Sequence, residues 1–255
     1  MINRPFGLSI FYLCVSSMSS KLTQALAPYD NQKRTEPGPL PTKPFLWALV
    51  GKKGCSKTTV VLNVLQRKES PLYRRFDLIF WVSPTAVNDP KVHDLLDDIG
   101  PDQVFDDLNN DVIERIVSMC EGYTVKKKKK DPHYLVVFDD VIHQIKSKSA
   151  SLITRLATQN RHLKLSCFFL LQKWKSFPTM IRSNLDCISF FHNENEAEVS
   201  SFCSEIGNED RIRAMYEFAT AEPYSFFHVN SYAQPTTYYR RFDEIKFQKK
   251  HLVEK

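Results

Sequence analysis

The amino-acid sequence predicts an α/β fold, with a mostly parallel β-sheet covered by helices on both faces. Uninterrupted apolar runs of strand length recur along the chain, and segments with helical periodicity separate them. Strands that are apolar throughout are typical of parallel sheets, because helices cover both faces of such a sheet. The chain has 255 residues, of which 42% are hydrophobic and 25% charged, which is sufficient for one core of ordinary size.

Six apolar segments are expected to form the strands. They cover residues 45–50, 76–82, 134–138, 166–171, 187–191 and 225–229. Valine and leucine recur at helical spacing at positions 60, 61, 64 and 65, so a helix is predicted over 57–66, directly after the first strand. A mostly helical insert is expected between the second and third strands.

The segment between the first strand and its helix has the spacing of a phosphate-binding loop. Residues 51–58 read GKKGCSKT, with Ser56 in place of the usual glycine before the lysine. In such a loop, glycines let backbone N–H groups face the phosphates, Lys57 neutralises their charge, and the Thr58 hydroxyl binds Mg²⁺. The residues predicted to bind ATP are Gly51, Gly54, Cys55, Ser56, Lys57, Thr58 and Thr59. The alternative is a glycine-containing turn without a ligand.

Two adjacent carboxylates, Asp139 and Asp140, follow the strand predicted at 134–138. Ligands of α/β proteins bind at the carboxyl ends of the strands. Asp139 is therefore predicted to hold Mg²⁺ together with Thr58, and Asp140 to orient or deprotonate the attacking water. Without the phosphate loop, Asp140 would be interpreted as the N-cap of a following helix. Gln172 closes another apolar run and is predicted to hydrogen-bond the γ-phosphate or the water.

Basic residues supply two further expectations. An arginine that neutralises charge developing on the γ-phosphate would speed phosphoryl transfer, and Arg161 and Arg182 are the candidates, with Arg161 preferred and acting on a neighbouring subunit. The alternative for each is an ordinary ion pair. The net charge of +6 fits an anionic partner such as nucleic acid. The five lysines at 126–130 are expected to form an exposed loop that is either solvated or in contact with DNA phosphates.

The order of these segments resembles that of the genome-packaging ATPases of large DNA viruses and virophages, of the poxvirus type. The resemblance rests on the phosphate loop, on FDLIFWVSPT at 76–85, on FDDV at 138–141, and then on Arg161-His162, Leu171-Gln172 and Pro178-x-x-Ile181-Arg182-x-Asn184. That family belongs to the FtsK/HerA superfamily of P-loop ATPases. The resemblance implies a RecA-like sheet of order 5-1-4-3-2, a homo-oligomeric ring, and ATP- and Mg²⁺-dependent movement of double-stranded DNA into a capsid. It also implies contact with a capsid protein and a location in the host cytoplasm, a viral factory or the virion.

Two other functions fit the same loop. In a P-loop kinase the γ-phosphate would go to a nucleotide or small molecule, but such enzymes need a mobile lid rich in arginine, and no compact segment offers one. The other is an interaction protein that keeps the fold and has weakened turnover, for which Ser56 is the main argument.

The predicted organisation is an N-terminal extension with a proline-rich linker at 1–44, a P-loop ATPase domain at 45–232 and a basic C-terminal tail at 233–255. The apolar run at 6–15 has some features of a signal peptide, but Lys21 and Pro28 fit poorly with a cleavage site, and the run is too short to span a membrane. No membrane partner is expected. The six cysteines lack CxxC spacing, which indicates free thiols in a reducing compartment.

Overall fold

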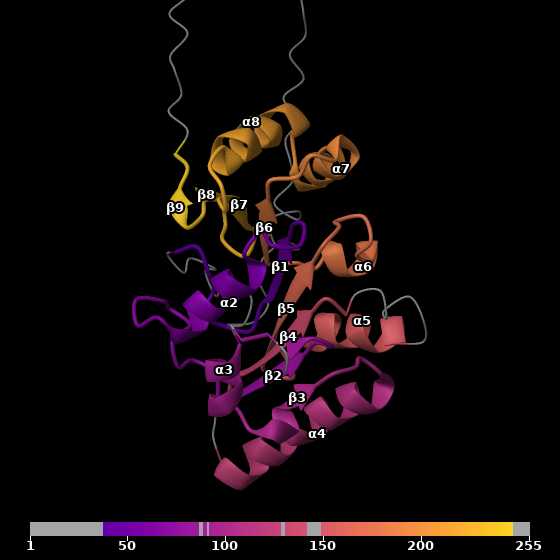
Figure 1. The fold of residues 1–255 in the computed structure, drawn as a ribbon. Helices are drawn as coiled ribbons and strands as arrows, with labels where there is room; N and C mark the ends of the chain where they lie inside the picture. The colour runs from indigo at the N-terminus through magenta and orange to yellow at the C-terminus, as the bar shows by residue number, and fades with distance from the viewer. Residues whose placement is uncertain (1–37, 87–88, 91, 129–130, 142–148, 247–255) are drawn as a thin grey trace, which may run out of the picture. The chain divides into compact units, whose positions relative to one another are not determined.

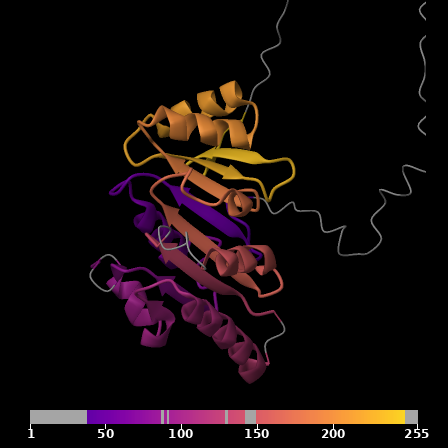
Figure 2. The same ribbon diagram turned by 90° about the vertical axis from the view of Figure 1, so that its right-hand side faces the viewer.

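A computed structural model describes residues 38–86, 89–90, 92–128, 131–141 and 149–246 of the chain. Within this part, one sheet has the strand order β3-β2-β4-β5-β1-β6-β7-β8-β9 (Figure 1). The strands are β1 (Leu46–Val50), β2 (Leu78–Val82), β3 (Val104–Phe105), β4 (Tyr134–Asp139), β5 (Leu165–Leu171), β6 (Cys187–Phe191), β7 (Phe226–Asn230), β8 (Thr237–Arg240) and β9 (Asp243–Glu244). Figure 2 shows them stacked from the magenta edge to the yellow hairpin.

The strand order at the centre of the sheet confirms the expectation. The first five predicted strands correspond to β1, β2, β4, β5 and β6, and they lie in the order β6-β1-β5-β4-β2, which is 5-1-4-3-2 in the predicted numbering. All of these pairings are parallel. In register, Val50 at the end of β1 lies opposite Leu171 of β5 and Phe190 of β6. The carboxyl ends of the central strands therefore meet at one edge of the sheet.

Helices cover both faces of the sheet, as the apolar strands require. In the described part of the chain they are α2 (Lys57–Gln66), α3 (His93–Asp98), α4 (Asn110–Lys127), α5 (Ser149–Gln159), α6 (Thr179–Arg182), α7 (Glu196–Ile206) and α8 (Glu209–Thr220), together with the 3-10 turn η2 (Pro101–Gln103). Three of them begin at an asparagine whose side chain accepts a backbone N–H of the first turn, namely Asn109, Asn195 and Asn208.

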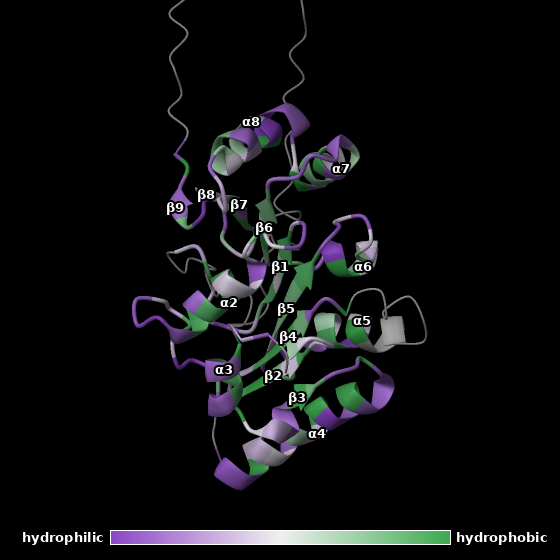
Figure 3. Cartoon of the chain, viewed as in Figure 1, coloured by the Kyte–Doolittle hydropathy of each residue, from purple (hydrophilic) through white to green (hydrophobic). Residues whose placement is uncertain are grey.

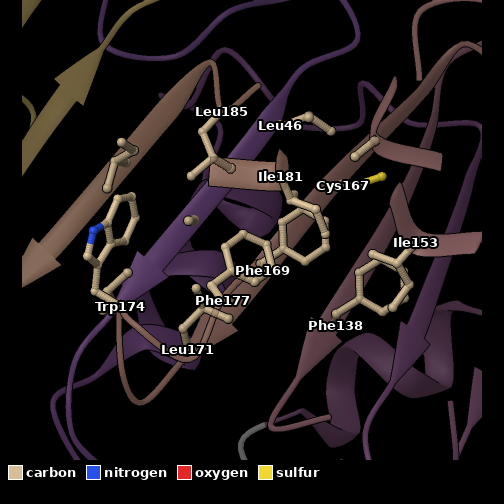
Figure 4. Packing of buried hydrophobic residues seen from close by; sticks show 14 of the residues in the cluster. Leu46, Phe138, Ile153, Cys167, Phe169, Leu171, Trp174, Phe177, Ile181 and Leu185 are labelled. Carbon is tan, nitrogen blue, oxygen red and sulfur yellow. The ribbon is translucent and has the colours of Figure 1, made fainter. Parts of the chain in front are cut away.

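The alternation of side chains along each strand divides the core in two. Trp47 and Leu49 of β1 pack in one cluster with residues of α2 and α3, whereas Ala48 and Val50 pack in the other with residues of α4 to α8. Figure 4 shows the second cluster, where Phe138 and Phe169 stack with ring centroids 5.3 Å apart. The hydropathy colouring in Figure 3 places the green residues on the strands and on the inner sides of the helices. No described helix combines the length and apolar character needed to cross a bilayer.

The sheet has more strands than predicted, and the additional strands lie outside the predicted ones on both sides. β3 pairs in parallel with β2 from within the insert that was expected to be mostly helical, and this strand was missed because it has only two residues. On the other side, β7 confirms the strand expected at 225–229, and β8 and β9 continue the sheet past residue 232. The boundary predicted there between the ATPase domain and a basic tail therefore falls inside the sheet.

Two other segments differ from expectation. Lys126 and Lys127 are the last residues of α4 rather than part of a loop, because cations at a helix C-terminus interact favourably with the helix dipole. Residues 38–40 of the proline-rich linker pack on the sheet. Leu40 is buried, and the Pro39 carbonyl accepts a hydrogen bond of 2.7 Å from His228 Nε2, since proline loses its donor but keeps its acceptor.

Candidate nucleotide site

The phosphate loop is shaped by close packing beneath it. A Cβ on Gly51 would lie 2.6 Å from Cys55 Sγ and 2.8 Å from Phe191 Cβ, so only glycine fits at this position. Gly54 has a φ of +82°, which is a left-handed conformation that glycine adopts without strain. Ser56 also lies in the left-handed region, with φ 78° and ψ 22°, and its side chain does not cap α2. The loop therefore keeps the glycine-type backbone at Ser56 at the expense of strain.

Lys57 is held inside the loop by its own backbone. Its Nζ donates to the carbonyl oxygens of Gly51 at 2.7 Å and Lys52 at 3.1 Å, and it lies 3.8 Å from Cys55 Sγ. The side chain is buried. The first backbone N–H groups of α2 have no partner within the helix, so they are available to phosphate oxygens next to this ammonium.

Thr58 and Asp139, the pair predicted to hold Mg²⁺, come together from α2 and β4. The Thr58 hydroxyl donates to Asp139 Oδ2 over 3.4 Å. Burial raises the pKa of Asp139 to about 6, with Asp140 and Asp89 acting in the same direction and Lys57 opposing them. A carboxylate and a hydroxyl of this kind suit Mg²⁺, which binds through one or two protein oxygens and completes its shell with water and phosphate oxygens. A bound cation would favour the charged form of Asp139.

Asp140 and Gln172 meet across the neighbouring strands β4 and β5. Gln172 Nε2 donates to Asp140 Oδ1 over 2.6 Å, and both side chains are exposed at the sheet edge. Asp140 has a φ of 57°, a conformation that aspartate tolerates better than most residues. Val141, which follows Asp140, is not helical, and residues 142–148 lie outside the described part of the chain.

These residues line a cavity of about 270 Å³ at the carboxyl ends of the strands. Its walls are Lys53, Gly54, Ser56, Lys57, Thr58, Thr59, Thr85, Asp89, Asp139, Asp140, Leu170 and Gln172. Gly51 and Cys55, also predicted to bind ATP, are not among the lining residues. A larger cavity of about 540 Å³ lies at the beginning of β2 and is lined by neither the loop nor the acid pair, so the smaller cavity is the candidate nucleotide site.

Sequence reasoning missed Thr85 and Asp89. Both follow β2, which pairs with β4, so the loop after β2 reaches the same sheet edge as the aspartates. Thr85 is held there by Ser83, whose Oγ accepts the Thr85 N–H at 3.3 Å. The polar residues directly after the second predicted strand were the signal that could have found them.

The two candidate arginines do not line the cavity. Arg182 has partners within its own chain, because its guanidinium donates to the carbonyls of Trp174 and Phe177 at 3.2 and 3.0 Å and forms an ion pair with Glu205 at 3.0 Å. Arg161 precedes β5 and forms an ion pair of 3.4 Å with Asp186 while remaining half exposed. The seven-residue strand β5 spans about 23 Å. Arg161, which precedes it, therefore lies near the amino ends of the parallel strands, whereas the nucleotide site of the same subunit lies at their carboxyl ends.

Comparison with known protein families decides the classification. A family model described as the poxvirus A32 protein matches residues 33–219, which is most of the chain. The chain belongs to the poxvirus A32 family. This confirms the resemblance to poxvirus-type proteins that the order of the motifs indicates. No curated protein sequence matches this A32-family chain.

Solved structures similar to the A32-family chain share its fold. The genome packaging NTPase B204 from Sulfolobus turreted icosahedral virus 2, in complex with AMP, superposes with a TM-score of 0.58 at 16% identity, covering 82% of this chain and all of B204. Its complex with ATP-gammaS gives a TM-score of 0.53 at 16% identity, over 76% of this chain and 96% of B204. B204 from Sulfolobus turreted icosahedral virus, described as a DNA-packaging ATPase, gives 0.56 at 15% identity, over 77% and 98%. At these identities the comparison supports the P-loop NTPase-like α/β fold.

Proposed function

We propose that this A32-family chain is an ATPase that drives double-stranded DNA into a viral capsid. The observation that carries the proposal is the hydrogen bond of 2.6 Å between Gln172 and Asp140, next to the contact between Thr58 and Asp139. A site that only bound ATP would need the loop and the metal ligands. A second carboxylate, oriented by an amide from the neighbouring strand, is suited to activating water.

The chemistry follows from the positions of these groups. Lys57 and the N–H groups of the first turn of α2 bind the phosphate oxygens, and Thr58 and Asp139 would hold Mg²⁺, which would neutralise phosphate charge. Asp140 accepts a proton from water as the water oxygen attacks the γ-phosphorus. The bond to the β–γ bridging oxygen breaks, and ADP leaves with that electron pair. Gln172 holds the Asp140 carboxylate in position for this step.

The P-loop kinase is the weaker candidate. Kinase chemistry requires room for a phosphoryl acceptor and cations that enclose the phosphates. Among the described residues that line the cavity, the only cations are Lys53 and Lys57, and no arginine is present. The weakened interaction protein is addressed by measuring turnover, because its fold and nucleotide site would be the same.

The position of Arg161 supports an oligomer with shared sites. Within one subunit, about 23 Å of strand separates it from the nucleotide edge. In a ring, the edge of one subunit that carries Arg161 faces the nucleotide of the next, and Arg161 exchanges Asp186 for the γ-phosphate. An arginine supplied in this way is worth roughly 10³–10⁵ in rate in other P-loop systems. A capsid protein as docking partner, and action in the host cytoplasm, viral factory or virion, belong to the same proposal.

ATPase assays with and without duplex DNA test the proposal. The wild type should hydrolyse ATP faster with DNA, Lys57→Ala should lose nucleotide binding, and Asp140→Asn should bind MgATP but hydrolyse it at least 100-fold more slowly. A wild-type rate in Asp140→Asn would remove its proposed role. An increase in ADP that depends on a small acceptor would favour the kinase, and binding without turnover would favour the interaction protein.

A mixing experiment tests the shared site. Arg161→Ala and Lys57→Ala subunits should each be inactive alone, but a mixture forms some interfaces with both an intact loop and an intact arginine. Recovery of activity on mixing is the expected result. A monomeric protein with full DNA-stimulated turnover would contradict the shared site.

A further inference from the structure

The segment between β5 and α6 presents two lysines from a turn whose other large side chains point inward. Lys173 and Lys175 are exposed, whereas Trp174 and Phe177 are each 1% exposed. Figure 4 shows Phe177 beside Phe169, with Trp174 elsewhere in the same apolar cluster. The turn thus has a buried side that fixes it to the core and an outer side that carries two positive charges.

Charged side chains hold the backbone of this turn. Arg182 Nη1 donates hydrogen bonds to the carbonyl oxygens of both Trp174 and Phe177. The guanidinium also lies 5.3 Å from the centre of the Trp174 ring. The Lys175 N–H donates to Glu198 Oε2 over 3.1 Å. Burying an ionised group costs free energy unless the group is fully paired. The Arg182 guanidinium and the Glu198 carboxylate offset part of this cost through their hydrogen bonds to the turn, and these bonds hold its backbone in place.

Neither lysine is neutralised within the described part of the chain. Two other described lysines do have carboxylate partners, since Lys52 pairs with Glu194 at 2.9 Å and Lys164 with Asp131 at 3.2 Å. No carboxylate among the described residues lies within ion-pair distance of Lys173 or Lys175. A rigid turn that presents two unpaired ammonium groups is suited to an extended anion with repeated charges, such as the phosphate backbone of nucleic acid.

The turn is also directly joined to the nucleotide site. Lys173 follows Gln172, whose amide contacts Asp140 at 2.6 Å. Lys173 is therefore one residue away from a side chain that contacts the candidate catalytic carboxylate. The lysine cluster at 126–128, in contrast, ends α4 before β4 begins, at the opposite edge of the sheet from the nucleotide.

We propose that Lys173 and Lys175 form a DNA-backbone contact, with Arg182 and Glu198 as positioning residues that hold the turn. This inference rests on the proposed function, because it assigns the surface through which the ATPase grips its duplex. Each phosphate contact on duplex DNA contributes about 0.9 to the slope of log affinity against log salt. Loss of both lysines should lower that slope by about 1.8 and weaken binding roughly tenfold per lysine at 0.1 M salt.

The experiment measures binding of the full chain to a fluorescent 30-base-pair duplex from 0.05 to 0.3 M salt. The test variant is Lys173→Ala/Lys175→Ala. Its matched control is Lys68→Ala/Lys164→Ala, which removes the same amount of charge. Lys68 follows α2 and Lys164 precedes β5, so both lie near the amino ends of the strands, away from the nucleotide site. A third variant, Lys173→Arg/Lys175→Arg, keeps the charge and should keep the slope. Thermal unfolding establishes that each variant is folded.

The outcomes separate the two proposals. Loss of affinity and slope in the test variant alone supports the lysine turn. Equal affinity and slope in the wild type and the test variant, with both binding DNA, would overturn the turn while leaving DNA translocation intact. An equal loss in the Lys68/Lys164 control would also overturn it, since the effect would then be one of net charge. A wild type that does not bind duplex DNA would overturn the proposed function itself.

Discussion

Replacing Ser56 with glycine should make the protein more stable, although it removes a side chain. Ser56 adopts φ 78° and ψ 22°. A residue with a Cβ costs about 1–2 kcal/mol in this conformation. Glycine avoids that cost but has a more flexible unfolded state, which costs about 0.4–1 kcal/mol. The net gain in the free energy of unfolding is roughly 0.5–1 kcal/mol, which corresponds to a rise in Tm of about 1–4 °C for a domain of this size.

Calorimetry of Ser56→Gly, Ser56→Ala and the wild type separates backbone strain from other effects of the side chain. The Ser56 hydroxyl does not cap α2, so Ser56→Ala should keep the strain and change Tm little. Ser56 also lines the cavity, so loss of its Cβ should enlarge the additional rise in Tm that a non-hydrolysable ATP analogue produces. An equal rise in Tm for alanine and glycine, or no rise for glycine, would refute the argument from strain.

Three further predictions concern single side chains. Burial lowers the pKa of His228 to about 4, so the neutral imidazole contributes fully to the free energy of unfolding above pH 6.5 and contributes less as the pH falls. Urea unfolding should show that, between pH 7.5 and 5, the wild type loses about 2 kcal/mol more of its free energy of unfolding than His228→Gln does. Burial raises the pKa of the partly exposed Cys55 thiol, so in a Cys14→Ser background maleimide should label Cys55 about tenfold faster per pH unit from 7 to 8, and an ATP analogue should slow it. Arg182→Ala should lower the free energy of unfolding by about 2 kcal/mol, since it removes the ion pair with Glu205 and leaves the Phe177 carbonyl without its donor, and mixing it with Lys57→Ala should not raise its activity.

The acid pair and the glutamine that the sequence predicted for the site lie at strand ends. Asp139, Asp140 and Gln172 each close or follow an apolar run, and parallel pairing of β4 with β5 brings the ends of such runs to one edge. Their proximity therefore follows from local patterns and one general rule. Thr85 and Asp89 depend in addition on β2 lying next to β4, which is a pairing of segments more than 50 residues apart. Local patterns do not contain that information.

The role of Arg182 was beyond sequence reasoning for a related reason. Its partners are two carbonyls in the preceding turn and a carboxylate on α7, and only tertiary packing brings Glu205 to it. The same holds for the carbonyl oxygens of Gly38 and Pro39, which accept hydrogen bonds from Asn230 and His228 on β7, about 190 residues later in the chain. The proline content of this segment predicted an irregular backbone. Amino-acid composition does not, however, predict which donors its backbone carbonyl oxygens will accept hydrogen bonds from.

Arg161 shows how the sheet itself constrains the mechanism. Residues that follow parallel strands share an edge, and residues that precede them share the other, about 23 Å away along β5. A side chain of about 7 Å cannot cross that distance, so Arg161 can act in phosphoryl transfer only on the nucleotide of another subunit. Oligomerisation is then a condition for a rate that depends on Arg161. If Arg161→Ala leaves DNA-stimulated turnover unchanged in an assembled ring, the ion pair with Asp186 is its whole role, and the charge on the γ-phosphate is neutralised by another cation.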